Sequence, residues 1–234
     1  IVRVLKTPAE VIQAKKNLKA IIRWGVGYDS VDIEAAGKAG IMVANMPGVN
    51  AYAVSELAVA LMLSAGRRVT DQNRLTHDGI WNNKLYAKQM TTLNHKTVGV
   101  IGGGHIGRMV AGQVQNFGAD VVYYDAFRMN EEKEEEFHMK YLPLEELVKV
   151  SDVITIHVPL LESTRHIIGK QEIESMKNGV ILINTARGGL IDDQALAEAL
   201  VSGKVAAAGL DCVEDENLEE NPLAKMSNVI LTPH

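Results

Sequence analysis

TVGVIGGGHIG, at residues 97–107, is a short apolar run that passes directly into a glycine-rich turn. The apolar run is typical of a buried strand, and the apolar spacing of Ile106–Phe117 predicts a helix immediately after the turn. In the turn, Gly102 permits the tight bend, Gly104 lets backbone approach a pyrophosphate, and Gly107 lets the helix pack closely on the strand. This G-x-G-x-x-G pattern is weak alone. Between a strand and a helix it predicts a dinucleotide site, because the free N–H groups of the helix N-terminus face the phosphates.

A carboxylate, Asp125, follows the next predicted strand, Asp120–Tyr124. In this position a carboxylate accepts hydrogen bonds from the adenosine ribose hydroxyls of NAD and repels the 2′-phosphate of NADP. Arg128 is close enough in sequence to weaken that discrimination, and a helix N-cap or turn role is the alternative for Asp125. Because the glycine turn precedes it, we expect Asp125 to bind the cofactor and the cofactor to be NAD.

Short apolar runs rich in Val and Ile alternate with amphipathic segments from Val98 onward. Buried parallel strands have this composition, and their alternation with helices predicts an α/β fold with a doubly wound parallel sheet, the Rossmann class. The further predicted strands are Val153–His157, Val180–Asn184, Ala206–Leu210 and Val229–Leu231. The further predicted helices are Leu144–Val150, Gln171–Met176 and Gln194–Val201.

The pattern before Val98 is looser. Two strands, Ala20–Ile22 and Ile41–Ala44, are predicted with a helix, Val31–Ala39, between them. A longer helix, Ala53–Arg67, follows, and Asn50 is a candidate for its start.

These first elements are too few to close a core alone. Residues 1–46 are therefore expected to be part of a second α/β domain, and residues 47–234 to be the dinucleotide-binding domain, with the boundary near Pro47. The sequence starts without Met and stops directly after a strand-like run, which predicts that both ends have been trimmed.

The composition restricts the classes of function. The 234 residues are 47% hydrophobic, enough for a sizeable core, and the net charge of −5 gives no electrostatic reason to bind nucleic acid or an anionic membrane. The most apolar stretch, Ala51–Ala65, contains Glu56 and is too short to span a bilayer. The single cysteine, Cys212, excludes an internal disulfide and predicts a reducing, cytoplasmic compartment. The acidic run Glu131–Glu136 predicts a solvated helix face or loop.

Ligands of open α/β sheets bind beyond the carboxyl ends of the strands, so the residues after each predicted strand are candidates for a site. Besides the glycine turn and Asp125, these residues are His157, Pro159, Thr185, Arg187, Asp211, Glu214, Asp215, Glu216 and His234. An arginine, several acids and a histidine around one crevice suit the reduction of a keto acid. Arg187 is expected to hold a substrate carboxylate by paired hydrogen bonds and to polarise the adjacent carbonyl. His234 is expected to give a proton to the carbonyl oxygen, and a neighbouring carboxylate would keep its imidazolium charged.

Each of these residues has a structural alternative. Arg187 could cap a helix or pair with Asp192, but Gly188-Gly189 beside it indicates backbone crowded against a ligand. His157 is as readily a half-buried structural histidine as a wall of the adenine pocket. Spacing does not show which acid of Glu214–Glu216 faces the site. No metal is predicted, because the other internal histidines lack metal-ligand spacing: His77, His95, His105, His138 and His166.

Several stretches also match one protein family, in the family's order and over nearly the whole chain. They are RWGVGYDSVD at 23–32, NMP at 45–47 with SE at 55–56, TVGVIGGGHIGR at 97–108, HVP at 157–159, NTARGGLID at 184–192, GLDCVEDE at 209–216 and TPH at 232–234. With these the sequence resembles the D-isomer-specific 2-hydroxyacid dehydrogenases, which include D-3-phosphoglycerate dehydrogenase and glyoxylate/hydroxypyruvate reductase. The Arg-Gly-Gly segment and the segment from Asp to Glu are specific to that family.

The resemblance implies substrate and catalytic roles that spacing left open. It places the catalytic carboxylate at Glu216, the acid/base histidine at His234 and the substrate-binding arginine at Arg187. It also implies that the backbone N–H groups of Val26 and Gly27 receive the substrate carboxylate.

The resemblance further implies cofactor roles and an assembly. His105 and Ile106 match the positions that meet the pyrophosphate, and Asp211 matches the residue that holds the nicotinamide carboxamide. Residues 1–46 would be part of a flavodoxin-like substrate domain. The helix Ala53–Arg67 and the segment through Trp81 match the region by which family members form homodimers.

The expected function is hydride transfer between NAD(H) and a small 2-keto acid or D-2-hydroxy acid. One alternative is oxidation of D-3-phosphoglycerate, in which Arg23 would bind the phosphate rather than be a surface arginine. An alternative of another class is an NAD(H)-sensing corepressor, because the family includes such proteins and they keep the Arg, Glu and His.

Overall fold

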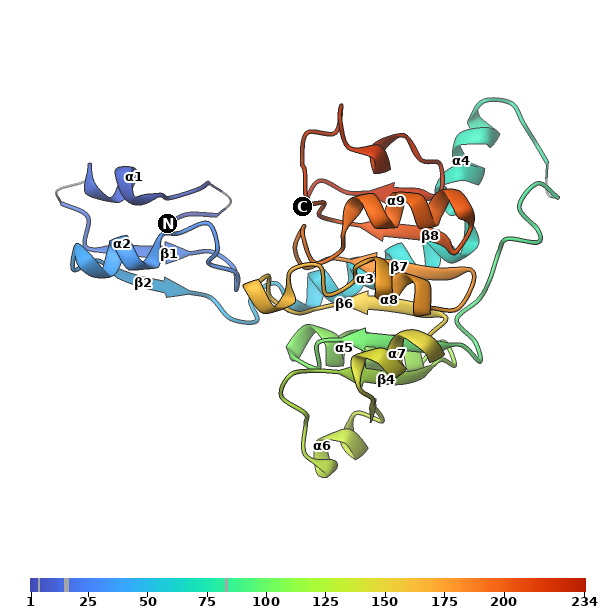
Figure 1. Ribbon diagram of the computed structural model, residues 1–234, viewed down its shortest axis with the longest axis horizontal. Coiled ribbons are helices and arrows are strands. Elements are labelled where there is room, and N and C mark those ends of the chain that lie inside the picture. The colour runs from blue at the N-terminus through green and yellow to red at the C-terminus, as the bar shows by residue number, and fades with distance from the viewer. Residues whose placement is uncertain (4, 15–16, 83) are drawn as a thin grey trace. The chain divides into compact units, whose positions relative to one another are not determined.

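A computed structural model of the chain describes residues 1–3, 5–14, 17–82 and 84–234 (Figure 1). The chain divides into two compact units, Ile1–Tyr52 and Ala53–His234. Each unit has buried apolar side chains of its own. Among the described residues no helix is both long and apolar enough to cross a bilayer.

The second unit is built on a seven-stranded parallel sheet with the order β5-β4-β3-β6-β7-β8-β9. The chain runs outward from β3 to β5 and then, from β6, outward in the other direction. The order therefore reverses between β3 and β6, and ligands of such sheets bind beyond the carboxyl ends of the strands at that reversal. The strands are β3 (Thr97–Ile101), β4 (Asp120–Tyr124), β5 (Lys140–Tyr141), β6 (Val153–Ile156), β7 (Val180–Asn184), β8 (Val205–Leu210) and β9 (Val229–Leu231).

Helices cover both faces of this sheet (Figure 1). One face carries α3 (Ala51–Arg67) and α5 (His105–Gln115), and the other carries α7 (Leu144–Val150), α8 (Lys170–Ser175) and α9 (Asp193–Ser202). In β7, Ile181 and Ile183 join the apolar cluster under α3 and α5, whereas Val180 and Leu182 join the cluster under α7 to α9. A strand buried on both faces has no polar alternation, which explains why these strands read as continuous apolar runs.

The first unit has a two-stranded parallel sheet of β1 (Ala20–Arg23) and β2 (Met42–Asn45). Helix α2 (Ile33–Lys38) connects the two strands, and α1 (Ala9–Gln13) precedes them. Asp32 caps α2, because its Oδ1 accepts a hydrogen bond of 2.8 Å from the N–H of Ala35. Among the described residues, the apolar core cluster of this unit consists of Ile12, Ile21, Val31, Ala36 and Ile41.

The predicted doubly wound parallel sheet is confirmed, and every strand predicted for it is present. The edge strand β5, with only two residues, and the polar helix α4 (Val69–His77) were not predicted from the pattern. The acidic run forms the exposed helix α6 (Glu131–Glu136), which Asn130 caps. Two short 3₁₀ turns, η1 (Glu162–Thr164) and η2 (Pro222–Lys225), complete the described elements.

Candidate functional site

The glycine turn joins β3 to α5, and its glycines meet different requirements. A Cβ at Gly102, where φ is +106°, would lie 2.7 Å from the backbone of His157. A Cβ at Gly107 would lie 2.0 Å from the carbonyl oxygen of Gly102, whereas a Cβ at Gly104 would meet no described atom within 4 Å. Contacts within the chain therefore require the first and third glycines, while the space beside Gly104 is open to a ligand.

The N-terminus of α5 lies at this open space. Gly104 is the N-cap residue, so no side chain caps the first turn, which begins with His105 and Ile106. The orphan N–H groups and the positive end of an 11-residue helix dipole favour an anion here. The turn therefore fits the pyrophosphate of a dinucleotide.

Asp125 is anchored beside the same turn. Its Oδ2 accepts a hydrogen bond of 2.8 Å from the N–H of Gly103, and its Oδ1 accepts one of 2.9 Å from the N–H of Phe127. The second bond is a turn contact, but the N-cap of the following helix is Asn130, so the N-cap alternative for Asp125 does not apply. Each carboxylate oxygen keeps a further lone pair, which leaves both able to accept a ribose hydroxyl.

His157 and Pro159 follow β6, across the sheet reversal from the glycine turn. The His157 Nε2 lies 2.9 Å from the hydroxyl of Thr155. The surrounding protein atoms desolvate the imidazole and lower the pKa of His157 to about 3. The ring is therefore neutral at physiological pH and offers an uncharged wall to the crevice, as an adenine pocket requires.

Thr185 follows β7 and carries a polar atom without a partner. The residue is buried, and its Oγ1 has no hydrogen-bond partner among the described residues. Buried hydroxyl groups are almost always hydrogen-bonded, so an orphan of this kind indicates a partner that comes from outside the chain. This position fits a polar group of the dinucleotide.

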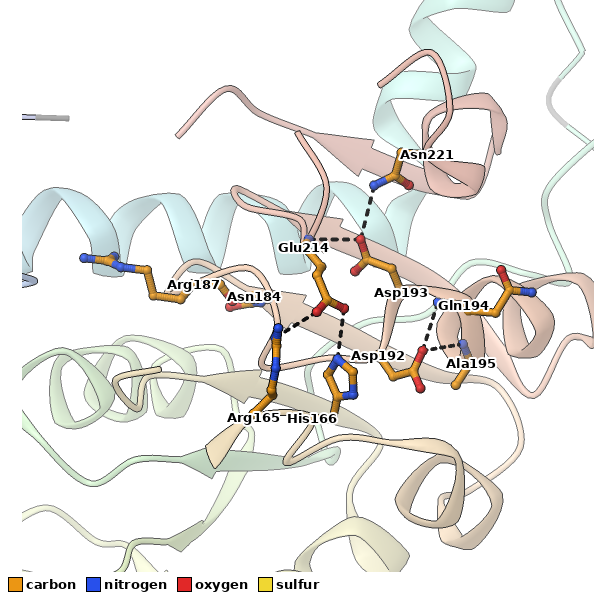
Figure 2. Close-up of polar contacts among 10 residues, drawn as sticks. All are labelled: Arg165, His166, Asn184, Arg187, Asp192, Asp193, Gln194, Ala195, Glu214 and Asn221. Atoms are coloured by element: carbon orange, nitrogen blue, oxygen red, sulfur yellow. Dashed lines mark hydrogen bonds and ion pairs between the residues drawn. The ribbon is translucent and has the colours of Figure 1, made fainter. Parts of the chain in front are cut away.

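Asn184, which was not among the predicted site residues, organises the loop that carries Arg187. Its Nδ2 donates a hydrogen bond of 2.8 Å to the carbonyl oxygen of Arg187, and its Oδ1 accepts one of 3.0 Å from the N–H of Ala186. The Arg187 Nη1 itself donates to the carbonyl oxygen of Ala186. Figure 2 shows the guanidinium extending away from Asp192, whose carboxylate caps α9 instead.

The glycines beside Arg187 have a different explanation from the predicted one. A Cβ at Gly188 would lie 1.9 Å from the carbonyl oxygen of Val213, so this backbone is crowded against the chain itself rather than against a ligand. The contact presses the Arg187 loop against the loop that follows β8. The two loops that carry candidate catalytic residues are therefore in contact with one another.

Glu214 forms an ion-pair junction on the loop after β8 (Figure 2). Its Oε1 lies 2.8 Å from the Nη1 of Arg165, and its Oε2 lies 2.9 Å from the Nε2 of His166. Its N–H donates a bond of 3.0 Å to Asp193, and Asn221 donates one of 3.1 Å to the same carboxylate oxygen. Burial raises the pKa of Asp193, and these two bonds oppose that shift.

This junction distinguishes Glu214 from the other two acids, Asp215 and Glu216, that spacing left equivalent. Glu214 is bound to the chain, whereas Glu216 is exposed and has no side-chain partner among the described residues. Asp215 is exposed as well, and its side chain accepts only a turn bond of 2.9 Å from the N–H of Asn217 within the described residues, so Asp215 and Glu216 both remain available to a substrate or to a histidine. The sequence contained no spacing signal for the junction, because Arg165 and Glu214 are distant in the chain.

Asp211 and the Thr-Pro-His segment are joined at the ends of β8 and β9. The N–H of Asp211 donates a bond of 2.8 Å to the carbonyl oxygen of Asn184, and the hydroxyl of Thr232 donates one of 2.6 Å to Asp211. His234 is exposed, and within the described residues no hydrogen bond joins it to Glu216. Between these strand ends Cys212 is buried, and burial raises the pKa of its thiol to about 12, which makes it an inert core residue.

In the first unit, Val26 and Gly27 lie in the loop after β1. The carbonyl oxygen of Val26 accepts a bond of 2.8 Å from Asn45, while the N–H groups of Val26 and Gly27 donate none within the described residues. Arg23 is buried, and its Nη1 donates to the carbonyl oxygen of Trp24. The sequence left two interpretations of Arg23, a phosphate ligand or a surface arginine, and its burial argues against the second.

These features define a dinucleotide-binding domain of the Rossmann class: a glycine turn at the sheet reversal, an uncapped helix N-terminus, an anchored carboxylate and an orphan hydroxyl. Within the described part of the chain, no group of three or more His, Cys, Asp or Glu side chains is placed to hold a metal ion. The sequence profile of the D-isomer specific 2-hydroxyacid dehydrogenase NAD binding domain matches residues 59–234. The chain belongs to this family, which confirms the resemblance and NAD as the cofactor.

Individual relatives bear out the assignment. The chain is 46% identical over 230 residues to D-3-phosphoglycerate dehydrogenase of Archaeoglobus fulgidus, and this match covers 98% of the chain but 43% of that protein. It is 44% identical to hydroxypyruvate reductase of Thermotoga maritima, covering 98% of the chain and 74% of that protein. The crystal structure of a glyoxylate reductase from Paecilomyes thermophila matches with a TM-score of 0.87 at 39% identity, covering 97% and 68%. The chain thus spans less than half of the first relative and about three quarters of the second.

Proposed function

We propose that this chain supplies the NAD site and part of the substrate site of an enzyme that interconverts a small 2-keto acid and a D-2-hydroxy acid. One observation carries the proposal. Asn184 holds the Arg187 loop by its side chain and Asp211 by its carbonyl oxygen, and Thr232 bonds to Asp211. These bonds connect the starts of the three segments that carry Arg187, Glu216 and His234. The connection lies at the carboxyl edge of the same sheet that holds the glycine turn.

In the proposed reduction, Arg187 binds the substrate carboxylate by paired hydrogen bonds and polarises the neighbouring carbonyl. His234 donates a proton to the carbonyl oxygen, and bound NADH supplies the hydride that the keto carbon receives. Glu216 keeps the imidazolium charged before the transfer. The N–H groups of Val26 and Gly27 add hydrogen bonds to the substrate carboxylate.

The proposed cofactor site lies wholly in residues 47–234, and residues 1–46 would be part of a flavodoxin-like substrate domain. The residues assigned to the cofactor are Gly102, Gly104, His105, Ile106, Gly107, Asp125, His157, Pro159, Thr185 and Asp211. Asp211 is assigned to the nicotinamide carboxamide, and its bond from Thr232 would fix the carboxylate for that purpose.

The test is oxidation of NADH by the full-length protein with glyoxylate, hydroxypyruvate, pyruvate and branched 2-keto acids. We expect turnover of at least one of them. Arg187→Ala should raise KM for the keto acid, and His234→Ala should lower kcat by about 10²–10⁴-fold. Glu216→Gln should also lower kcat, and Glu219→Gln, the same charge change on the same exposed loop, is its matched control and should leave both constants unchanged. An unchanged rate in His234→Ala would overturn the mechanism.

A second candidate is oxidation of D-3-phosphoglycerate, favoured by the 46% identity to the archaeal D-3-phosphoglycerate dehydrogenase. In this candidate Arg23 binds the substrate phosphate. The test is activity with phosphohydroxypyruvate. If Arg23→Ala loses this activity and keeps glyoxylate reduction, the D-3-phosphoglycerate reaction is favoured over the small 2-keto acid reaction. Tight NADH binding with no turnover of any keto acid would instead favour the corepressor class.

We also propose that the protein forms a homodimer through α3 and the segment that ends at Trp81, in the cytoplasm. Trp81 is 87% exposed, and Ile80 and Leu85 near it are exposed as well. A dimer would cover this apolar surface. Sedimentation should give twice the chain mass, and Trp81→Glu should shift it toward the monomer, whereas the distant exposed Phe127→Glu should not.

A further inference from the structure

Arg128, in the loop between β4 and α6, is held by a carboxylate of its own chain. Its Nε and Nη2 donate hydrogen bonds of 2.8 and 2.9 Å to the two carboxylate oxygens of Glu134. This is the bidentate geometry in which an arginine–carboxylate pair is strongest. The guanidinium also lies over the ring of Tyr141, 5.0 Å from its centroid.

Glu134 is itself fixed from the other side. The hydroxyl of Tyr123 donates a bond of 2.7 Å to its Oε1, and the N–H of Met129 donates one of 2.9 Å to that hydroxyl. The pair with Arg128 lowers the pKa of Glu134 to about 2, so its charge persists throughout the physiological range. Arg128 therefore has a permanent, oriented counter-charge rather than a passing surface partner.

The location of this pair matters because Arg128 is three residues beyond Asp125. Asp125 is held against the glycine turn by the N–H of Gly103. An arginine in this loop is the group that receives the 2′-phosphate in domains that use NADP. Here the arginine is present, but Glu134 neutralises it and occupies one edge of its guanidinium.

We propose that Glu134 determines the preference for NAD by holding Arg128 away from the 2′ position of the adenosine ribose. The role rests on the NAD site proposed at the glycine turn and adds a second residue to the cofactor preference assigned to Asp125. Glu134 does not touch the cofactor and is a positioning residue. With Arg128 paired to Glu134, the negative charge of Asp125 dominates the electrostatic potential at the 2′ position. Release of Arg128 would add a positive charge without its partner beside that position.

The test measures equilibrium binding by calorimetry and needs no turnover. The ligands are NADH, NADPH and the fragments 5′-AMP and adenosine 2′,5′-bisphosphate. Glu134→Gln keeps an acceptor for Tyr123 but removes the charge. We expect it to bind NADPH and the bisphosphate about tenfold more tightly, while NADH and 5′-AMP change less than about twofold. The gain should diminish as salt is added.

A matched control and a double variant isolate Arg128. Glu135→Gln makes the same charge change on the exposed side of the same helix and should leave NADPH binding near its original value. Adding Arg128→Ala to Glu134→Gln should abolish the gain. A gain that survives without Arg128, or an equal gain in Glu135→Gln, would overturn the proposal, as would unchanged NADPH binding in Glu134→Gln.

Two further measurements separate the possible failures. If Glu134→Gln does not fold, Glu134→Ala also releases Arg128 and must show the same gain. Asp125→Asn tests the ribose contact independently, because it should raise NADPH affinity with the Glu134 pair intact. If Asp125→Asn has no effect while the Glu134 cycle behaves as expected, the ribose assignment fails and the role of Glu134 stands. Neither result depends on which keto acid is reduced.

Discussion

At the residue scale, a buried amide rather than a charged group fixes the candidate active site. Asn184 is only 2% exposed, and both ends of its side chain bond to the loop that carries Arg187. Asn184→Ala would leave the N–H of Ala186 and the carbonyl of Arg187 without partners, at a cost of about 1–3 kcal/mol. We expect kcat/KM for the keto acid to fall at least about tenfold, with a smaller change in the Kd of NADH.

The control for this change is Asn116→Ala, which removes an exposed amide whose one bond within the described residues is to the carbonyl oxygen of Gly112. Steady-state kinetics and NADH titration of both variants make the comparison. Equal losses in the two variants, or a loss confined to NADH binding, would show that Asn184 does not position Arg187.

His157 makes stability depend on pH in a stated direction. The pKa of His157 in the folded chain is about 3, below the usual value of about 6.5, so the folded state favours the neutral ring. Its contribution to stability is complete above pH 6.5 and is lost as the pH falls toward 3, because only the unfolded chain then binds the proton. Urea unfolding midpoints over this range should fall more steeply in the parent than in His157→Gln. The free energies of unfolding from these curves, plotted against pH, should have slopes that differ by up to about 1.4 kcal/mol per pH unit between the two proteins. Parallel plots would contradict the assignment.

At the element scale, the predictions succeeded where burial decides the structure. The strands β3, β6 and β7 are buried on both faces, so their Val and Ile runs identify them from sequence alone. The helix α4 is polar, and β5 is too short for any period to appear, so tertiary context rather than pattern determines both. The glycine turn was predictable because its backbone constraints are local.

The contacts between elements could not be predicted from the sequence, for a different reason. Gly188 was predicted to face a ligand, but it faces Val213, because a crowded backbone looks the same in sequence whatever crowds it. Asn184 and Glu214 both lie inside the matched motifs, yet their partners are set by how loops meet. The roles of Glu216 and His234 still rest on the resemblance.

The junction between the two residues that follow η1 and the loop after β8 has a functional consequence. Glu214, two residues before Glu216, connects this loop to Arg165 and His166. Glu214→Gln would weaken the junction and loosen the loop that carries Glu216. We expect kcat to fall about tenfold, with KM and the Kd of NADH changing less than about threefold, because Glu214 is not among the residues proposed to bind either ligand.

The matched control is Glu220→Gln, a charge change further along the same loop with no side-chain partner in the described chain. The pH profile of kcat should also shift in Glu214→Gln if Glu216 is displaced from the acid/base group, and stay in place in the control. A loss of thermal stability with kcat and its pH profile unchanged would reduce Glu214 to a structural role.

At the scale of the whole molecule, the two units differ in how much core they possess. The second has two apolar clusters, one on each face of its sheet, whereas the buried cluster of the first has five side chains among the described residues. Small cores give low local stability, so amides of β1 and β2 should exchange with solvent faster than those of β3 and β7.

Leu182→Ala tests whether the units are also independent. Leu182 is fully buried in β7, in a cluster whose described members all lie beyond residue 52, and its truncation should cost about 2–5 kcal/mol. Hydrogen exchange followed by mass spectrometry should then quicken in β3, β6 and β7, with β1 and β2 unchanged. Ile21→Ala, in the cluster of the first unit, is the reciprocal variant and should affect β1 and β2 alone. Acceleration of all strands by either variant would mean that the two units unfold as one cooperative body despite their separate cores.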